Sequence, residues 1–192
     1  MSRLAANLHR MNNTEINALA RNPYVDPAIQ LRIAKEHHLK AREYLACNPN
    51  LISEAREVLW SGKSHVVKCC LVAHNHCHDE PDKIREVYEA KSPQYWRNAQ
   101  WRMQWTFLGS HWRTYGAYKT PADVLNAIYD NHICHNAPMP MSPYSKPHAA
   151  MAMARQETID TGLAIKMSVH QEEEKIRKAG FDALIMLKRQ EK

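Results

Sequence analysis

Apolar residues recur at helical spacing through the first half of the chain. Between polar turns they stand three or four positions apart, as in Ala55, Val58 and Leu59, which is the spacing of one buried helix face. Runs that alternate Val, Ile or Thr with polar residues, the pattern of a half-buried strand, are rare, and the chain has only five glycines. The pattern therefore predicts an all-α fold.

A five-residue phrase marks the turns between these helices. Leu-Ala-x-Asn-Pro occurs at residues 19–23 and again at residues 45–49, 26 positions later. Asn before Pro is driven out of the α region, which ends one helix, and Pro suits the first turn of the next because its missing N–H costs nothing there. The second residues of looser copies stand at positions 5, 20, 34, 46, 60 and 73. We therefore predict a repeat of two short helices, each with its turn.

The segments LARNPYVDPAIQLRIAKE and LACNPNLISEAREVLWSG resemble leucine-rich-repeat-variant and HEAT-like helical repeats. The resemblance covers roughly residues 4–90 and depends on the repeated phrase and its spacing. It implies a short right-handed superhelix, an α-solenoid, with a concave binding face. Some members of these families hold an iron–sulfur centre or excise damaged bases. We expect neither property in this chain, because no cysteine precedes Cys47 and no catalytic residue of those families can be matched to a residue of this sequence.

Aromatic and basic side chains gather in residues 93–119. This stretch holds eight of the fifteen aromatic residues, and no acidic residue lies between Glu89 and Asp123. Trp101, Trp105 and Trp112 recur at helical spacing, so we expect them in the core. The aromatic residues off this stripe, with the basic residues, are expected to bind a partner. The predicted partner-binding residues are Trp96, Arg97, Arg102, Arg113, Tyr115 and Tyr118.

The last third of the chain begins with a proline-rich segment. Four prolines interrupt residues 136–148, which predicts an extended linker or strap. Residues 149–192 return to helical spacing and are predicted to form a C-terminal helical arm, which either folds back on the repeat or pairs with another chain. The predicted organisation is a helical-repeat domain with its aromatic and basic continuation (1–135), a linker (136–148) and an arm (149–192).

Composition and charge narrow the classes of function. The chain is 44% hydrophobic and 24% charged, which is ordinary for a globular protein. No apolar run has the length of a signal peptide or a membrane span, so no membrane partner is expected. The odd count of five cysteines indicates reduced thiols and a cytoplasmic protein. A net charge of +6 leaves acidic partners open.

Two clusters of side chains of the types that bind zinc occur in the sequence. They comprise His74, His76, Cys77 and His78, and then His132, Cys134 and His135. Their spacings match no zinc knuckle, so we predict solvent-facing turn histidines and buried cysteines, with no metal and no cofactor. The sequence leaves open whether either cluster binds a metal. The neighbours Cys69 and Cys70 face different sides of a helix, which favours core packing over redox chemistry.

No catalytic motif occurs: the chain has no GxGxxG, P-loop, GxSxG or HExxH pattern. We therefore predict a non-enzymatic binding or adaptor protein. A protein partner is favoured, because the net charge is modest and aromatic residues outnumber basic ones in the aromatic segment. The first alternative is nucleic-acid binding through the acid-free stretch at residues 90–122. The second is a structural subunit of a larger assembly or oligomer joined through residues 137–192.

Overall fold

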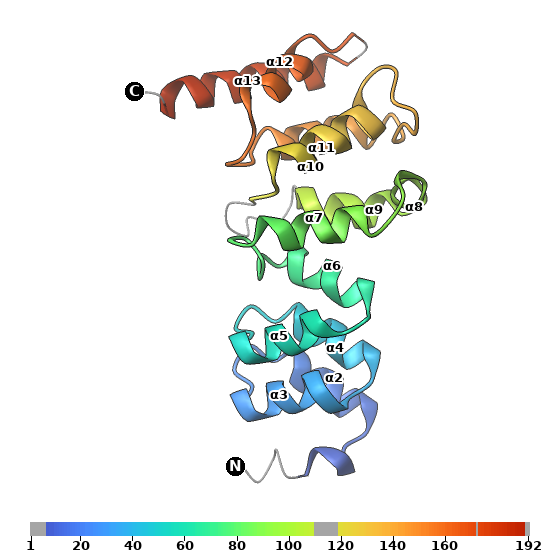
Figure 1. Cartoon of the computed structure of the whole chain (residues 1–192), viewed down its shortest axis with the longest axis vertical. Helices are drawn as coiled ribbons and strands as arrows, with labels where there is room; N and C mark the ends of the chain where they lie inside the picture. Colours follow the sequence, from blue (N-terminus) through green and yellow to red (C-terminus); the bar gives the residue numbers. More distant parts are fainter. Residues whose placement is uncertain (1–6, 110–118, 172, 191–192) are drawn as a thin grey trace. The chain divides into compact units, whose positions relative to one another are not determined.

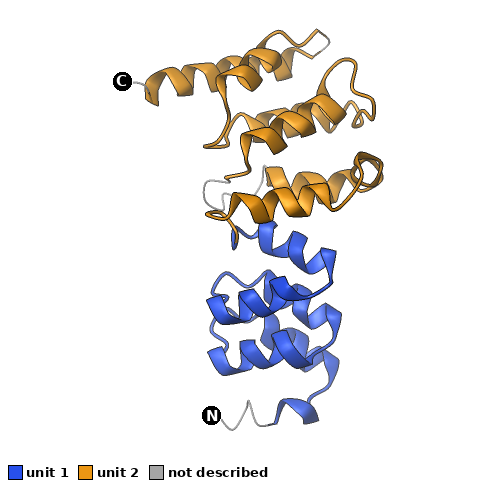
Figure 2. Ribbon diagram, viewed as in Figure 1, with its two compact units in different colours: residues 1–76 blue, residues 77–192 orange. Residues whose placement is uncertain are grey.

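The computed structural model describes residues 7–109, 119–171 and 173–190. These residues form twelve α-helices and three 3-10 or π-helical segments, without a strand, so the predicted all-α class is confirmed. The chain divides into two compact units, residues 1–76 (unit 1) and 77–192 (unit 2; Figure 2). Among the described helices, none combines the length and the apolar character needed to cross a bilayer.

Unit 1 is built from two series of short helices that alternate along the chain (Figure 1). α2, α4 and α6 begin at residues 13, 39 and 65, and α3 and α5 begin at residues 27 and 53, so both series advance by 26 residues. α2 packs against α4 and α4 against α6, while α3 packs against α5. The elements are η1 (Leu8–Arg10, 3-10), α2 (Asn13–Arg21), α3 (Pro27–Glu36), α4 (Leu39–Ala46), α5 (Ser53–Ser61) and α6 (His65–Ala73).

Helix starts in unit 1 are capped by side chains at the same 26-residue spacing. Asn12, His38 and Ser64 precede α2, α4 and α6, and each accepts a hydrogen bond from a backbone N–H of the first helical turn. Asn12 forms a complete capping box, because Glu15 bonds back to its N–H. Asp26 caps α3 in the same way, ahead of Pro27. The repeated helix starts thus have a local chemical cause.

Asn48 connects the two copies of the Leu-Ala-x-Asn-Pro phrase. Its side chain is buried, and Nδ2 donates to the carbonyl oxygens of Ala20 (3.1 Å) and Asn22 (2.8 Å) in the preceding copy. Those carbonyls lie at the end of α2, where helices leave acceptors without an intrahelical partner. Asn48 therefore follows the end of α4 in its own copy and also donates hydrogen bonds to the carbonyl groups at the end of α2 in the copy before it.

Unit 2 is less regular, and two of its helices end in π-helical turns. Trp96 and Phe107 are buried at its centre against Tyr88, and α11 packs against η2, η3 and α13. The elements are α7 (Pro81–Glu89), α8 (Pro93–Asn98), α9 (Gln100–Met103), η2 (Gln104–Leu108), α10 (Ala122–Ile128), η3 (Tyr129–Ile133), α11 (Lys146–Met153), α12 (Thr161–Ser168) and α13 (Glu174–Gln190).

The proline-rich segment is part of unit 2, which differs from the predicted boundaries at residues 136 and 149. The N–H groups of Met139 and Met141 donate to the carbonyls of Asn131 and His132, and Met141 is buried. A proline has no backbone N–H to donate, but Met139 and Met141, which alternate with the prolines, keep theirs. The segment can therefore pack against η3. α11 also begins at Lys146, inside the predicted linker, because Pro147 is tolerated in the first turn.

The predicted arm consists of α12, α13 and most of α11, and it folds back within unit 2. α13 packs along α12 and also contacts α11 (Figure 1). The two helices approach closely at Gly180, where an added Cβ would lie 2.3 Å from the backbone nitrogen of Ser168. A residue without a side chain is therefore required at this crossing. The arm was predicted as continuous helix, but the helices are interrupted at residues 154–160 and again at residues 169–171.

Candidate functional site

Trp96, one of the predicted partner-binding residues, belongs to the core instead. Its side chain has no exposed surface, and its Nε1 donates to the carbonyl oxygen of Tyr88 at 3.0 Å. Its ring stacks on Tyr88, with centroids 6.2 Å apart, and meets Phe107 edge-on at 5.4 Å. The prediction that Trp96 binds a partner is therefore wrong. Trp96 lies off the helix face that was predicted to carry the buried tryptophans, but it is buried against Tyr88 and Phe107.

The other predicted binding residues divide into two groups. Arg97 is exposed and Arg102 is half-buried, so both can be reached from solvent. Arg113, Tyr115 and Tyr118 lie outside the described residues. The predicted site is therefore described only at its N-terminal side, in α8 and α9.

Trp101 is exposed, although its spacing predicted a core position. Its side chain is 66% exposed, while Trp105 is half-buried and Trp112 lies outside the described residues. The helix is broken at Ala99, and the buried stripe that follows runs through Met103 and Phe107. At about 100° per residue, Trp101 is turned about 200° away from Met103. It therefore faces solvent.

Four side chains on α8, α9 and the turn before them form what we call the aromatic–cation cluster: Lys91, Tyr95, Trp101 and Arg102. Arg102 donates from a guanidinium nitrogen to the Tyr95 hydroxyl at 3.1 Å, and its Cζ lies 5.1 Å from the Trp101 ring centroid. The ammonium of Lys91 lies 5.1 Å from the ring centroid of Tyr95. Both cations are thus held against aromatic faces.

The cluster combines properties suited to recognition. No acidic residue occurs in sequence between Glu89 and Asp123, so its positive charge is not cancelled by a carboxylate of its own segment. The rings offer apolar faces with polar edges, and Trp, Tyr and Arg dominate the binding energy at protein interfaces. The same faces can stack on nucleic-acid bases while the cations contact phosphates.

Sequence inspection missed Lys91, Tyr95 and Trp101 as site residues. Lys91 and Tyr95 stand four positions apart, a spacing that brings side chains together within a helix, but Lys91 lies in the turn before α8. A competing stripe through Met103 and Phe107 was also visible and would have turned Trp101 outward. The break at Ala99 had no such signal, because alanine is a strong helix former.

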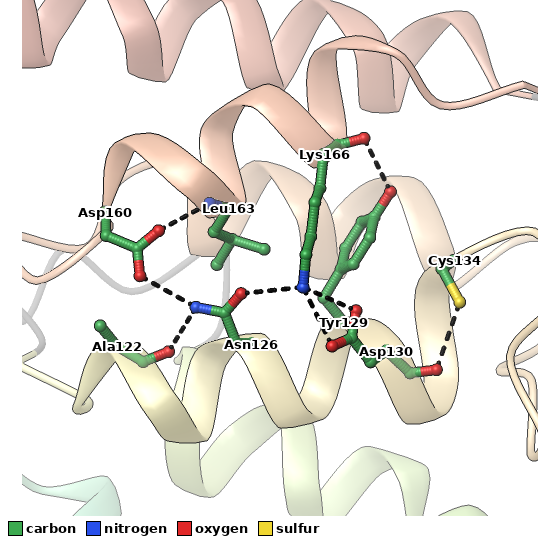
Figure 3. Close-up of polar contacts among 8 residues, drawn as sticks. All are labelled: Ala122, Asn126, Tyr129, Asp130, Cys134, Asp160, Leu163 and Lys166. Atoms are coloured by element: carbon green, nitrogen blue, oxygen red, sulfur yellow. Dashed lines mark hydrogen bonds and ion pairs between the residues drawn. The ribbon is translucent and has the colours of Figure 1, made fainter.

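A second polar site lies between α10, η3 and α12 in unit 2. The ammonium of Lys166 bonds to the Asp130 carboxylate at 3.0 Å and to the Asn126 side chain at 3.2 Å (Figure 3). Asn126 in turn donates to Asp160, and the Tyr129 hydroxyl donates to the carbonyl of Lys166 at 3.1 Å (Figure 3). Burial raises the pKa of Tyr129 to about 12, so its hydroxyl stays protonated as this donor.

This network attaches α12 to α10 and η3. A pocket of about 310 Å³ opens beside it, with Asp130, Cys134 and Lys166 in its wall. The charged groups of the wall are already paired with each other, and Cys134 donates to the Asp130 carbonyl at 3.2 Å. We therefore assign the network a structural role, because its polar atoms are engaged in holding the helices.

The two clusters weighed as metal sites have other contacts. His132 is fully buried, with Nδ1 2.9 Å from the carbonyl of Met139, and burial lowers its pKa. In the other cluster, His78 pairs with Asp79 at 2.7 Å and Cys77 is buried. Within the part of the chain that the structure describes, no three His, Cys, Asp or Glu side chains are arranged to hold a metal.

No protein-family model matches the chain, and neither does any curated protein or any solved structure. Function must therefore be inferred from the residues themselves. Among the described surfaces, the aromatic–cation cluster combines the largest exposed aromatic ring with two cations held beside rings.

Proposed function

We propose that this chain is a non-enzymatic binding protein that engages a protein partner through the aromatic–cation cluster. The observation that carries the proposal is the exposure of Trp101, 66%, next to Arg102. Tryptophan and arginine are the residues most enriched at binding hot spots, and a surface tryptophan offers a large area that a partner can desolvate. Such a protein would act as an adaptor, with binding as its output.

The helix that carries Trp101 has a further unusual property. It continues from α9 into η2, a π-helical segment at Gln104–Leu108. π-helical turns are rare and are frequent at functional sites. Here the wider turn begins at Gln104, three residues after the exposed Trp101. A π-helical segment close to an exposed aromatic residue supports a site maintained for binding.

We further propose that unit 1 belongs to the HEAT-like and leucine-rich-repeat-variant class and forms part of a superhelical scaffold. The support is the 26-residue spacing of its helix starts and the Asn48 contacts between successive turns. Helical repeats of this kind present extended surfaces to macromolecules. Unit 1 would then serve as the scaffold and unit 2 as the carrier of the aromatic–cation cluster.

Nucleic-acid binding is the second candidate. Its support is the charge of the same surface: Lys91, Arg97 and Arg102 fall in a stretch without acidic residues, next to an exposed ring. Phosphate contacts make affinity fall steeply with salt, whereas an interface dominated by aromatic burial depends less on salt. The two candidates therefore differ in a property that is simple to measure.

Capture from a native lysate tests the proposal. The intact chain is immobilised, and the lysate is divided into two halves, of which one is treated with nuclease. We expect a discrete protein that survives nuclease and is lost when Trp101→Ala or Arg102→Gln replaces the wild type. Tyr144→Ala is the matched control, because Tyr144 is 89% exposed in the same unit but lies outside the cluster.

Capture that disappears with nuclease would contradict the protein-partner proposal and favour nucleic acid. Capture that persists in both cluster variants but is lost in the Tyr144 variant would move the binding surface away from the cluster. In each case the binding curve is repeated at three salt concentrations, because the slope separates phosphate contacts from aromatic burial.

A further inference from the structure

The hairpin of α12 and α13 in unit 2 exposes large apolar side chains on one of its sides. Ile165 on α12 is 50% exposed, and Phe181 and Ile185 on α13 are 56% and 51% exposed. Exposed apolar side chains that lie together, with charged residues around them, mark interaction sites. These residues are on other helices than the aromatic–cation cluster, which occupies α8, α9 and the turn before them.

The close crossing at Gly180 shows that the three apolar side chains share one side of the hairpin. Gly180 lies against the backbone of Ala164, so these two residues face each other. Ile165 and Phe181 each follow by one residue, a step of about 100° around a helix. α12 and α13 pack together in opposite directions (Figure 1), and the same step in two antiparallel helices leads to the same side of the pair. Ile185 lies one turn after Phe181 and extends this apolar surface.

Two lysines bracket the apolar residues on α13. Lys178, Phe181, Ile185 and Lys188 follow one another at steps of 3, 4 and 3 residues, which makes a stripe along one face of a helix. Both lysines are exposed, and neither ammonium group has a hydrogen bond or an ion pair with a described residue. α13 carries five basic and two acidic residues in all, so the helix is positively charged. We call this stripe, together with Ile165, the α12–α13 face.

We propose that the α12–α13 face binds an amphipathic helix of a protein partner, in which acidic residues bracket the apolar ones. The apolar residues of that helix pack on Ile165, Phe181 and Ile185 and remove them from water. Its carboxylates pair with Lys178 and Lys188, whose positions along α13 are about 15 Å apart. The chain then has a second binding surface in addition to the aromatic–cation cluster and can join two partners.

The charges of α13 favour this partner over a second copy of the chain and over a lipid surface. A two-fold axis through the stripe pairs α13 with an antiparallel α13 and places Lys178 opposite Lys188 of the other copy, so like charges meet. An anionic lipid surface meets the exposed carboxylates of Glu174 and Asp182 as well as the lysines. A helix contacts only the stripe between the two lysines.

Titration of the intact chain with two labelled synthetic helical peptides tests the proposal. The acidic peptide contains Glu-x-x-Leu-x-x-x-Leu-x-x-Glu, which repeats the spacing of the stripe, and the basic peptide has Lys in place of both Glu residues. Fluorescence anisotropy should show the acidic peptide binding about tenfold more tightly or better. Lys178→Glu combined with Lys188→Glu should reverse this preference. The matched control, Arg155→Glu with Lys175→Glu, changes the net charge equally at exposed positions outside the face and should preserve it.

Two exposed apolar residues of α13 measure the apolar contact. Phe181→Ser should weaken binding of the acidic peptide by about tenfold or more, because it removes the largest apolar group of the face. Met186→Ser is the control, since Met186 is 39% exposed but is turned about 140° from Phe181 around the helix. Its effect on Kd should stay below about threefold. The wild-type titrations decide even where a variant folds poorly.

Several results would overturn the proposal. They are equal affinity for the two peptides, no binding of either up to about 1 mM, or unchanged binding in Phe181→Ser. Sedimentation of the chain alone tests the second copy: a dimer that Phe181→Ser dissociates would assign the face to self-association instead. Flotation with vesicles of phosphatidylcholine and phosphatidylserine tests the lipid surface: binding to the vesicles but not to the acidic peptide would contradict a protein partner.

Discussion

Units 1 and 2 stabilise their helices by different means. In unit 1, side chains at equivalent positions bond to the backbone of the next turn: Gln30 donates to the carbonyl of Asn50, and Arg56, 26 residues later, donates to that of His76. In unit 2, contacts that do not recur along the chain hold the helices together, such as the Lys166 network and the close crossing at Gly180. Unit 1 therefore repeats one type of contact between helices, whereas unit 2 uses several different types.

This difference bears on where a binding surface can arise. A repeated arrangement commits the same positions in every turn to internal contacts. In unit 2 the helix is broken at Ala99, and in the helix that follows the break Met103 is buried and Trp101 faces solvent. The comparison is the reason why we propose unit 1 as the scaffold and the exposed Trp101 of unit 2 as part of the binding surface.

The largest expected effect comes from the helix crossing of unit 2. In Gly180→Ala the new Cβ would lie 2.3 Å from Ser168 N, 2.7 Å from Met167 C and 2.8 Å from Ala164 O, all of which are backbone atoms. Because backbone cannot move aside locally, we expect a loss of about 3 kcal/mol or more in the free energy of unfolding. Urea denaturation followed by circular dichroism measures it.

Gly162→Ala is the control for this change. Its Cβ would meet only the side-chain oxygen of Asp160, at 3.2 Å, so the unfolding free energy should change by less than about 1 kcal/mol. Equal effects at the two glycines would show that helix α13 does not cross α12 as closely as described.

Asn48→Ala should have the next largest effect, and it acts on unit 1. The substitution leaves the carbonyls of Ala20 and Asn22 without their donor at a buried site. We expect a loss of about 2–3 kcal/mol in unfolding free energy, since unsatisfied buried acceptors are costly. Hydrogen exchange of the amides of α2 and α4 would locate the loss in unit 1.

Asn50→Ala provides the comparison two residues away. Its Nδ2 donates to the carbonyl of Pro23 at 2.9 Å, but the side chain is exposed and water can replace the bond. We therefore expect a loss below about 1 kcal/mol. If both substitutions cost the same, burial of Asn48 would not be the reason for its effect.

A smaller effect concerns pH and the buried histidine of unit 2. Burial lowers the pKa of His132 below its ordinary 6.5, and its Nε2 is buried without a hydrogen-bond partner. The unfolded chain therefore binds the extra proton first, so stability is full above about pH 6.5 and falls as pH drops toward the folded pKa. Denaturation curves between pH 8 and pH 5 should show this loss.

His132→Asn should flatten that dependence without removing it. Asparagine keeps a donor for the Met139 carbonyl but does not titrate, whereas His37 in unit 1, whose pKa burial also lowers, continues to contribute. An unchanged slope in the variant would show that protonation of His132 is not coupled to unfolding.

Sequence alone predicted the parts of the fold that local chemistry determines. The Asn-Pro turns and the periodic apolar residues predict helices, and the 26-residue spacing of the phrase is also the spacing of the helix starts. Long-range packing was not predictable in this way. The burial of Trp96 depends on Tyr88 and Phe107, and the packing of the proline-rich segment depends on acceptors in η3.

The candidate site shows the same limit. The sequence singled out the aromatic and basic segment, including Arg97 and Arg102, but it predicted an exposed Trp96 and a buried Trp101, the reverse of what the structure shows. Which of two helical stripes is buried depends on a backbone break at Ala99 that the sequence does not signal.

The most direct test of the central claim, that unit 2 carries the binding surface, is the affinity of the captured partner for two matched variants. Trp101→Ala and Tyr24→Ala each remove an exposed aromatic side chain, 66% exposed in unit 2 and 88% exposed in unit 1. Calorimetric titration should show Trp101→Ala weakening Kd by about 30-fold or more, and Tyr24→Ala by less than about threefold. Unfolding free energies should change by less than about 0.5 kcal/mol in both. A Kd unchanged by Trp101→Ala, or weakened more by Tyr24→Ala, would contradict the account.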